Sequence, residues 1–361
     1  MRRVMCNVSW ICRRMNGETI APMRISARIS LVAWFVSALA FGQSNFAAAV
    51  KTGEGLPRLH SLLASRHGEI VLEHYFHGTR ATSFENVKSA SKSVISALVG
   101  IAIDRKLLPG VDAPIAPYFP ELSAVNADPA KRKITIEDLL TMRSGLVDTN
   151  RGYGAWARSP NWVRYLLTRP LQRQPGEPMN YNTGNTHLLS AILTKVSGSD
   201  TWSFAQNALG APLGITLAKW PRDPQGVYFG GNDMLLTPRQ MLKFGELYLH
   251  RGRNGDRQIV PASWVDASWT PRTRSLRSGH EYGYGWWITE LAGRPVEFAW
   301  GFGGQYIFVV PSLDLVVVTT SSVALGNDRR EYRQRVVRYR GKRCDRRDPE
   351  RDLTNRPFKT G

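Results

Sequence analysis

Strand-like segments lie at both ends of this chain, and a long helical stretch separates them. Residues 59–78 predict a hairpin that turns at His67-Gly68. Residues 135–255 are mostly helical in pattern, and the strand pattern returns afterwards over residues 282–289, 295–299, 305–310 and 313–321. Short loops join these later strands, so we expect an antiparallel sheet that the early hairpin also joins. The order of elements therefore predicts an α/β fold, with an antiparallel sheet flanked by helices plus a helical part.

The helical stretch carries start and stop signals. Residues 134–146 predict a short helix with Thr135 as its N-cap and Gly145 as its C-terminal stop. Thr237 followed by Pro238 predicts the start of another helix, because proline is favoured at the first helical position after a capping residue. We therefore expect both helices to begin directly after a threonine.

Size and charge exclude some classes of protein. The chain has 361 residues, enough for one large domain or two closely packed ones, and 42% of them are hydrophobic. The formal net charge is +19, but residues 1–49 hold +5 of it and residues 327–361 hold +7. The middle has no stripe of Lys and Arg interleaved with aromatic side chains, so we do not expect nucleic-acid binding. Residues 340–361 have almost no apolar content, which predicts that the basic tail is disordered.

The N-terminal residues have the pattern of a secretory signal that starts at Met23. Two arginines precede an apolar stretch over residues 29–41, and three alanines follow at residues 47–49. The alternative is a membrane anchor, but thirteen helical residues at about 1.5 Å each do not cross a hydrocarbon core of about 30 Å. We therefore expect cleavage near residue 49, with residues 1–22 as an upstream extension. The mature domain would be periplasmic or secreted, with no stable membrane span.

A serine and a lysine lie at the start of residues 92–104, a segment that is apolar nearly all round and predicts a buried helix. Ser89 and Lys92 are three positions apart and so share one helical face. The helix N-terminus favours the negative charge that develops in acyl transfer, and an apolar environment lowers the proton affinity of a lysine. The spacing alone is a weak signal, since a capping serine and a snorkelling lysine give the same pattern.

Four ordered segments together resemble the β-lactamase-like serine hydrolases. They read VKSASKSVISALVGIAID, ITIEDLLTMRSGL, PGEPMNYNTGN and FAWGFGGQYIFVVPSLDLVVVTT, and they fall within residues 55–325. The family includes class C β-lactamases, D-alanyl-D-alanine carboxypeptidases, related esterases and 6-aminohexanoate-dimer hydrolases. The resemblance implies a β-lactamase/transpeptidase-like domain over residues 50–326, with its active site in the cleft between the sheet and the helical part.

The resemblance implies a role for each matched residue. Ser89 would be the acylated nucleophile, Lys92 its proton-sharing neighbour, and Tyr181 the assisting phenol of the family's Tyr-x-Asn element. The backbone N–H groups of Ser89 and Phe302 would form the oxyanion hole, because acyl transfer needs donors aimed at the developing oxyanion. A phenol is a poor base at neutral pH, so a nearby ammonium must lower the pKa of Tyr181 or share its proton.

One departure from the β-lactamase pattern concerns the late strand. Ala299, Trp300 and Gly301 stand where β-lactamases have Lys-Thr-Gly or His-Thr-Gly. An apolar indole thus replaces a cation that helps to hold a carboxylate, whereas the glycine still permits a close backbone approach. We expect Trp300 and Gly301, together with Gln305, to contribute to substrate binding.

A second departure follows the tyrosine. Thr183 stands where the β-lactamase pattern has asparagine. Two neighbouring amides, those of Asn182 and Asn185, could each take the place of the missing side chain. Asn182 is the one we expect among the substrate-binding residues.

These features together predict a serine hydrolase that cleaves a small-molecule ester or linear amide through a Ser89 acyl-enzyme. A β-lactamase or D-alanyl-D-alanine carboxypeptidase is the alternative, and a catalytically silent binding relative is the alternative of another class. No cofactor or metal is implied. His74 and His77 point to opposite faces of a strand, and the three cysteines lie outside the middle of the chain.

Overall fold

The computed structural model of the protein describes residues 46–123 and 128–324. The upstream extension, most of the predicted signal peptide and the basic tail lie outside the described residues. Helix α2 (Ala47–Glu54) begins before the predicted cleavage position near residue 49, and Ala49 is buried in the domain.

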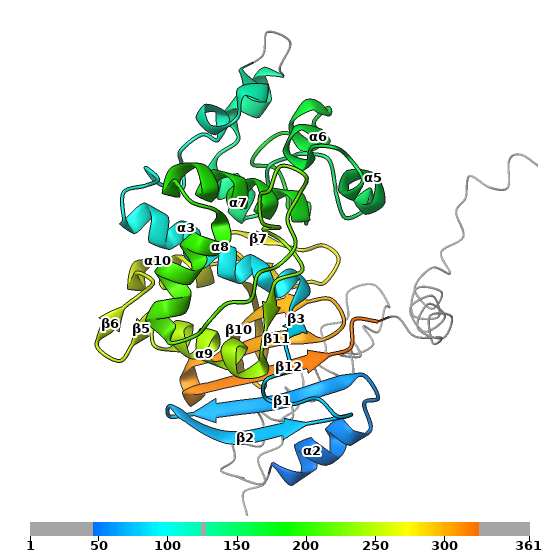
Figure 1. Cartoon of the computed structure of the whole chain (residues 1–361), viewed down its shortest axis with the longest axis vertical. Coiled ribbons are helices and arrows are strands. Elements are labelled where there is room, and N and C mark those ends of the chain that lie inside the picture. The colour runs from blue at the N-terminus through cyan, green and yellow to red at the C-terminus, as the bar shows by residue number, and fades with distance from the viewer. Residues whose placement is uncertain (1–45, 124–127, 325–361) are drawn as a thin grey trace, which may run out of the picture.

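One antiparallel sheet forms the lower part of the molecule in Figure 1. Within the described residues it has eight strands in the order β2-β1-β12-β11-β10-β9-β8-β7. The strands are β1 (Leu59–Arg66), β2 (Glu69–Tyr75), β7 (Thr273–Arg274), β8 (Glu281–Tyr282), β9 (Trp287–Leu291), β10 (Arg294–Gly301), β11 (Gln305–Val310) and β12 (Leu315–Ser321). Strand β1 pairs with β2 on one side and with β12 on the other. The predicted union of the early hairpin with the late strands is therefore confirmed.

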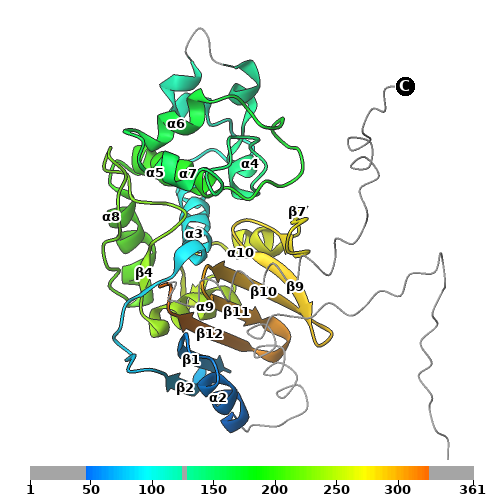
Figure 2. The ribbon, with the colours of Figure 1, turned by 90° about the vertical axis from the view of Figure 1, so that its right-hand side faces the viewer.

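Helices cover the sheet and build a second layer above it (Figures 1 and 2). They are α3 (Ser91–Asp104), α4 (Ile136–Leu140), α5 (Tyr153–Ala157), α6 (Trp162–Thr168), α7 (Thr183–Ser197), α8 (Thr201–Ala205), α9 (Pro238–Leu249) and α10 (Ala262–Trp269). Two short strand pairs accompany them, β3 (Glu85–Asn86) with β4 (Leu235–Leu236) and β5 (Arg253–Asn254) with β6 (Arg257–Gln258). Helix α3 is buried along most of its length, as predicted, and contacts α7, α10 and β10.

The strand predicted over residues 282–289 is wrong as a single element. Strand β8 ends at Tyr282 and β9 begins at Trp287, with a turn between them. Gly285 in this turn has a φ of +77°, and a Cβ there would lie 2.9 Å from the backbone oxygen of Lys92. Ser93 also donates a hydrogen bond of 2.6 Å to the carbonyl of Gly285. The break therefore allows the sheet to approach the start of α3.

The predicted helix caps are confirmed, but one predicted helix end is wrong. Thr135 and Thr237 both accept a hydrogen bond from the third helical residue and form capping boxes. Helix α4 ends at Leu140 and does not extend to Gly145. Gly145 lies in the following loop with a φ of +73°, where a Cβ would lie 2.1 Å from the backbone oxygen of Arg173.

Apolar clusters cover both faces of the sheet. Ile307 and Val309 of β11 pack into the cluster that contains α3, whereas Phe308 between them packs into the opposite cluster. This alternation is that expected of a strand buried on both faces. Tyr181 and Trp300 pack against the second cluster, so two of the predicted site residues share one apolar support.

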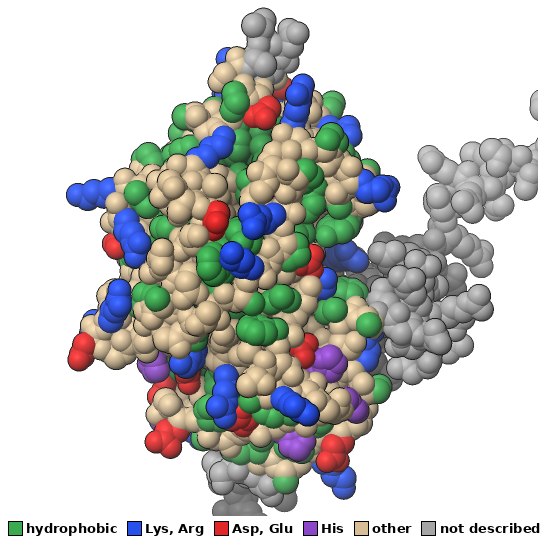
Figure 3. All heavy atoms as spheres, in the orientation of Figure 1, with side chains coloured by type: hydrophobic (Ala, Val, Ile, Leu, Met, Phe, Trp, Pro, Cys, Tyr) green, Lys and Arg blue, Asp and Glu red, His purple; other side chains and the backbone are tan. Residues whose placement is uncertain are grey.

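The surface shows no single concentration of charge on the face drawn in Figure 3. Lys and Arg side chains are spread there among Asp, Glu and uncharged side chains. Among the helices of the described residues, none is both long and apolar enough to cross a bilayer.

Candidate active site

Ser89 lies immediately before the buried helix α3. It belongs to a single 3₁₀ turn, Lys88–Ala90, and its side chain is partly exposed. Lys92 in the first turn of α3 is only 1% exposed, and its Nζ lies 3.1 Å from Oγ of Ser89. The structure therefore places the hydroxyl of a partly exposed serine in contact with a buried amine.

Three oxygen atoms surround the amine of Lys92. Besides Ser89, they are the carbonyl oxygen of Gly231 and Oγ1 of Thr183, the latter 3.2 Å from Nζ. Thr183 donates its own hydroxyl proton to Oδ1 of Asn150 at 2.7 Å, so its oxygen is left to accept from Lys92. In a neutral amine, the two N–H groups therefore point at Gly231 and Thr183, and the lone pair points at Ser89. This orientation suits removal of the serine proton.

Burial lowers the pKa of Lys92 to about 7. The ammonium form loses its contacts with water at this position, while the negative charge of Asp233 acts in the opposite direction and favours the ammonium. Near neutral pH, about half of the molecules thus carry an uncharged Lys92 that can accept the proton of Ser89. A general base is most effective when its pKa lies near the working pH.

The ring of Tyr181 packs near the same amine, with Nζ of Lys92 lying 5.2 Å from the ring centroid. Tyr181 stacks on Trp287 with 5.4 Å between ring centroids and meets Tyr282 edge-on at 6.1 Å. Burial raises the pKa of the Tyr181 phenol, and a hydrogen bond with Ser89 opposes this rise only in part. The lowering that we considered from the ammonium is therefore not found. Tyr181 keeps its proton near neutral pH and can act as a proton donor.

The amide near this cluster comes from Asn150, a residue that the sequence pattern did not indicate. Its Oδ1 accepts the hydroxyl proton of Thr183, and its Nδ2 donates to the carbonyl oxygen of Tyr181 at 2.6 Å. Asn150 thus fixes both the threonine that contacts Lys92 and the backbone of Tyr181. Its place in the loop after α4 gave no signal in the sequence, because the contact joins residues 33 positions apart.

The two asparagines considered from the sequence have other partners. Asn182 is the N-cap of α7, is 1% exposed, and accepts from the hydroxyl of Thr149 at 2.7 Å. Asn185 is fully buried and accepts from Oγ of Ser144 at 2.8 Å. The contacts of both side chains therefore support the loop and helix that carry Tyr181.

Strand β10 ends against the turn that carries Ser89. Gly301 permits this approach, because a Cβ there would lie 2.1 Å from the backbone oxygen of Val87. Phe302 follows directly, and this residue is 49% exposed. The oxyanion hole formed by the N–H groups of Ser89 and Phe302 stays a prediction, and the proximity of the two segments supports it.

Trp300 and Gln305 have different surroundings. Trp300 is partly buried beside Trp287, the ring on which Tyr181 stacks, with 5.6 Å between ring centroids. Gln305 is fully buried, and its side-chain amide pairs with the backbone of Ser321 through both its oxygen and its nitrogen. Trp300 therefore belongs to the aromatic wall beside the candidate site, whereas Gln305 joins β11 to β12.

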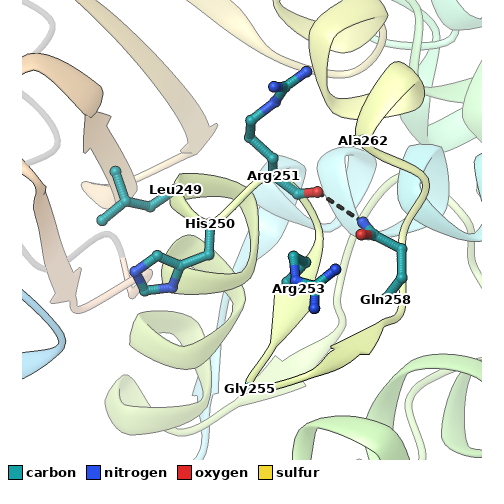
Figure 4. A pocket seen from close by; sticks show the side chains of 7 residues that line it. All are labelled: Leu249, His250, Arg251, Arg253, Gly255, Gln258 and Ala262. Carbon is teal, nitrogen blue, oxygen red and sulfur yellow. Dashed lines mark hydrogen bonds between the residues drawn. The ribbon is translucent and has the colours of Figure 1, made fainter.

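Two further features concern residues 46–123 and 128–324 outside the Ser89 site. A surface hollow at the β5–β6 hairpin, shown in Figure 4, contains none of the predicted site residues; it is lined by Leu249, His250, Arg251, Arg253, Gly255, Gln258 and Ala262. No group of three or more His, Cys, Asp or Glu side chains that could hold a metal ion occurs in these residues.

Comparison with known proteins assigns the chain to a family. The family model described as Beta-lactamase matches residues 60–342. The chain belongs to the Beta-lactamase family. Over 290 residues, the chain is 23% identical to the 6-aminohexanoate-dimer hydrolase of Paenarthrobacter ureafaciens. This match covers 73% of the chain and 72% of that protein. It is also 28% identical over 162 residues to PbpX of Bacillus subtilis, but the match spans only 42% of the chain and 39% of PbpX.

Solved structures share the fold. A D-stereospecific amidohydrolase from Streptomyces sp. has a TM-score of 0.62 and 18% identity, covering 76% of this chain and 93% of that one. A family VIII carboxylesterase has a TM-score of 0.59 and 15% identity, covering 83% and 93%. These likenesses confirm the predicted β-lactamase/transpeptidase-like fold. The family match adds that the chain is a β-lactamase-fold hydrolase, from a family in which catalysis is generally serine-based.

Proposed function

We propose that this protein is a serine hydrolase that cleaves an ester or a linear amide through an acyl-enzyme on Ser89. One observation carries the proposal: the buried amine of Lys92 lies 3.1 Å from Oγ of Ser89, with a pKa lowered to about 7. A serine hydroxyl is a weak nucleophile until an adjacent base removes its proton. An amine that is uncharged in about half of the molecules at neutral pH and directed at that hydroxyl is such a base.

The reaction follows from the geometry of these groups. The lone pair of Lys92 takes the proton of Ser89 while Oγ forms a bond to the substrate carbonyl carbon. The oxyanion that results is held by the N–H groups of Ser89 and Phe302. Tyr181 then donates its proton to the departing alkoxide or amine and recovers one from the Lys92 ammonium. Water attacks the acyl-enzyme along the reverse proton path and releases the acid.

The surroundings of the site favour neutral substrates. Trp300 and the exposed ring of Phe302 are apolar, and the imidazole of His280 packs edge-on to Trp300 with 6.3 Å between centroids. Burial lowers the pKa of His280, so this ring is uncharged at neutral pH and offers no cation to a carboxylate. A substrate carboxylate would then lose a charge-assisted contact worth about 1.5–3 kcal/mol, or roughly ten- to a hundredfold in affinity. A neutral ester or amide would lose none of this.

A β-lactamase or D-alanyl-D-alanine carboxypeptidase remains the second candidate, because the fold and the Ser89–Lys92–Tyr181 arrangement serve those reactions equally well. The test compares kcat/KM for a p-nitrophenyl ester, a short linear amide and a chromogenic cephalosporin on the same preparation. We expect the neutral ester or amide to be cleaved at least tenfold more efficiently than the cephalosporin, an order-of-magnitude expectation from the missing charge contact. Cephalosporin turnover equal to that of the ester would instead support the β-lactamase assignment.

A fluorophosphonate probe separates an active hydrolase from a silent binding relative. The probe should attach to Ser89 of the wild-type protein, and mass spectrometry of the labelled peptide identifies the residue. The variant Ser89→Ala is the control and should not be labelled. Labelling that persists in the variant would identify another nucleophile, and absence of labelling together with absence of turnover would support the silent relative.

A further inference from the structure

An ion pair lies beside the catalytic turn and is not part of the mechanism above. Nζ of Lys88, the residue before Ser89, lies 2.6 Å from Oδ1 of Asp233. The same carboxylate oxygen accepts from Nδ2 of Asn86 at 2.7 Å. Lys88 and Asp233 both have positive φ angles, 50° and 61°, which are uncommon for residues other than glycine. The backbone is therefore held in rare conformations on both sides of this pair.

The loop that carries Asp233 also contacts the amine of Lys92. Gly231, two residues before Asp233, accepts a hydrogen bond from Lys92 through its carbonyl oxygen. A Cβ at Gly231 would lie 2.8 Å from the backbone oxygen of Thr183 and 3.3 Å from Nζ of Lys92, so the loop passes close to the amine. The loop that carries Asp233 therefore connects the residue before Ser89 with the environment of Lys92.

We propose that the Lys88–Asp233 pair sets the protonation of Lys92, with Asp233 favouring the ammonium and Lys88 limiting that effect. The negative charge of Asp233 raises the pKa of Lys92 against the larger effect of burial. Lys88 carries the opposite charge at 2.6 Å from Asp233 and reduces the field that the carboxylate exerts nearby. Both residues are thus positioning residues for the amine, and the inference rests on the proposed role of Lys92 as the base.

Two phenols of the described residues interact with this arrangement. Tyr181 stacks beside the Lys92 amine and stays protonated, because burial raises the pKa of its phenol. Tyr153 interacts with Asp233, and both burial and that carboxylate raise the pKa of its phenol. Neither phenol changes charge around neutral pH. A shift in the pH at which activity rises, near pH 7, therefore reports on Lys92 and the ion pair.

The experiment measures the rate of Ser89 labelling by a fluorophosphonate between pH 5 and 10 in the variants Lys88→Gln and Asp233→Asn. Labelling requires an uncharged Lys92, so the wild-type rate should rise with pH through a midpoint near 7. Lys88→Gln leaves Asp233 uncompensated and should move the midpoint up by roughly half a unit to one unit, whereas Asp233→Asn should move it down by a similar amount. At pH 6 the first variant should therefore react about three- to tenfold more slowly and the second about three- to fivefold faster than wild type.

The double variant and a distant ion pair provide the controls. Lys88→Gln combined with Asp233→Asn should give a midpoint between those of the single variants. Arg239→Gln removes the pair with Glu73 on β2, at 2.7 Å, and should leave the midpoint unchanged. A purely structural ion pair would lower the rate at high pH without moving the midpoint, and that result, or two shifts of the same sign, overturns the proposal. Wild-type protein without any labelling at Ser89 would instead overturn the proposed function and, with it, this inference.

Discussion

Replacing Thr183 by valine removes one of the acceptors that orient the Lys92 amine while keeping the shape of the side chain. The hydroxyl oxygen of Thr183 lies 3.2 Å from Nζ of Lys92. The residue is only 4% exposed, so water does not readily replace the lost hydroxyl. A buried N–H group left without an acceptor costs about 1–3 kcal/mol, which corresponds to a rate loss of roughly five- to a hundredfold if the lone pair is no longer held toward Ser89. The loss should appear in the pH-independent plateau of kcat/KM or of fluorophosphonate labelling.

The same substitution should shift the pH profile in a direction that can be worked out. Thr183 accepts from Lys92 and so stabilises the ammonium more than the free amine. Its removal should lower the pKa of Lys92 further and move the acid limb to lower pH while the plateau falls. Thr183→Ser keeps the hydroxyl and should retain the wild-type midpoint with a plateau within about threefold of wild type. An unchanged plateau in Thr183→Val, or a limb that moves to higher pH, would refute this account of how the amine is held.

Three further predictions concern the proton-transfer groups, the oxyanion hole and export. Lys92→Ala and Tyr181→Phe should each lower kcat/KM by at least about a hundredfold, a typical scale for acid–base groups, and a folded variant with the wild-type rate would remove its residue from the mechanism. Gly301→Ala should lower Ser89 labelling by about a hundredfold or more, because its Cβ would meet the backbone oxygen of Val87 at 2.1 Å. Thermal unfolding would show whether the variant still folds. Undiminished labelling would show that the end of β10 does not contribute to the oxyanion hole. N-terminal sequencing of the exported protein should begin close to Val50, whereas an intact Met1 in a soluble cytosolic form would contradict export.

The parts of the fold that could be predicted depend on local pattern. The strand over residues 305–310, the apolar character of α3 and the capping threonines at 135 and 237 are each encoded within a few residues, and the structure has them where they were expected. The break between β8 and β9 could not be predicted in this way. Gly285 turns there because the backbone of Lys92 lies close by, 193 positions earlier in the sequence. A glycine in a strand-like segment signals such a close approach only in general terms.

The residues of the candidate site also differ in whether local sequence could predict them. Ser89 and Lys92 lie within one helical turn, so their spacing was sufficient to place them together. Tyr181 was selected through the family resemblance, because nothing in its immediate sequence links it to Ser89. Gly231 reaches the amine from a loop 139 positions away and was missed. The doublet Gly230-Gly231 was the one feature of the sequence that could have indicated a close backbone approach there, since a Cβ at either position would clash with the backbone of α7.

The threonine at position 183 shows why the missing asparagine of the family pattern did not disrupt the site. A hydroxyl can donate or accept, so a threonine beside an amine serves as an acceptor only when its own proton has another partner. Asn150 supplies that partner, because its Oδ1 accepts the proton of Thr183 at 2.7 Å. The same amide donates to the carbonyl of Tyr181, which couples the position of the tyrosine to the orientation of the hydroxyl. Two short side chains from separate segments therefore provide the fixed acceptor that Lys92 requires, and neither would indicate this role without the other.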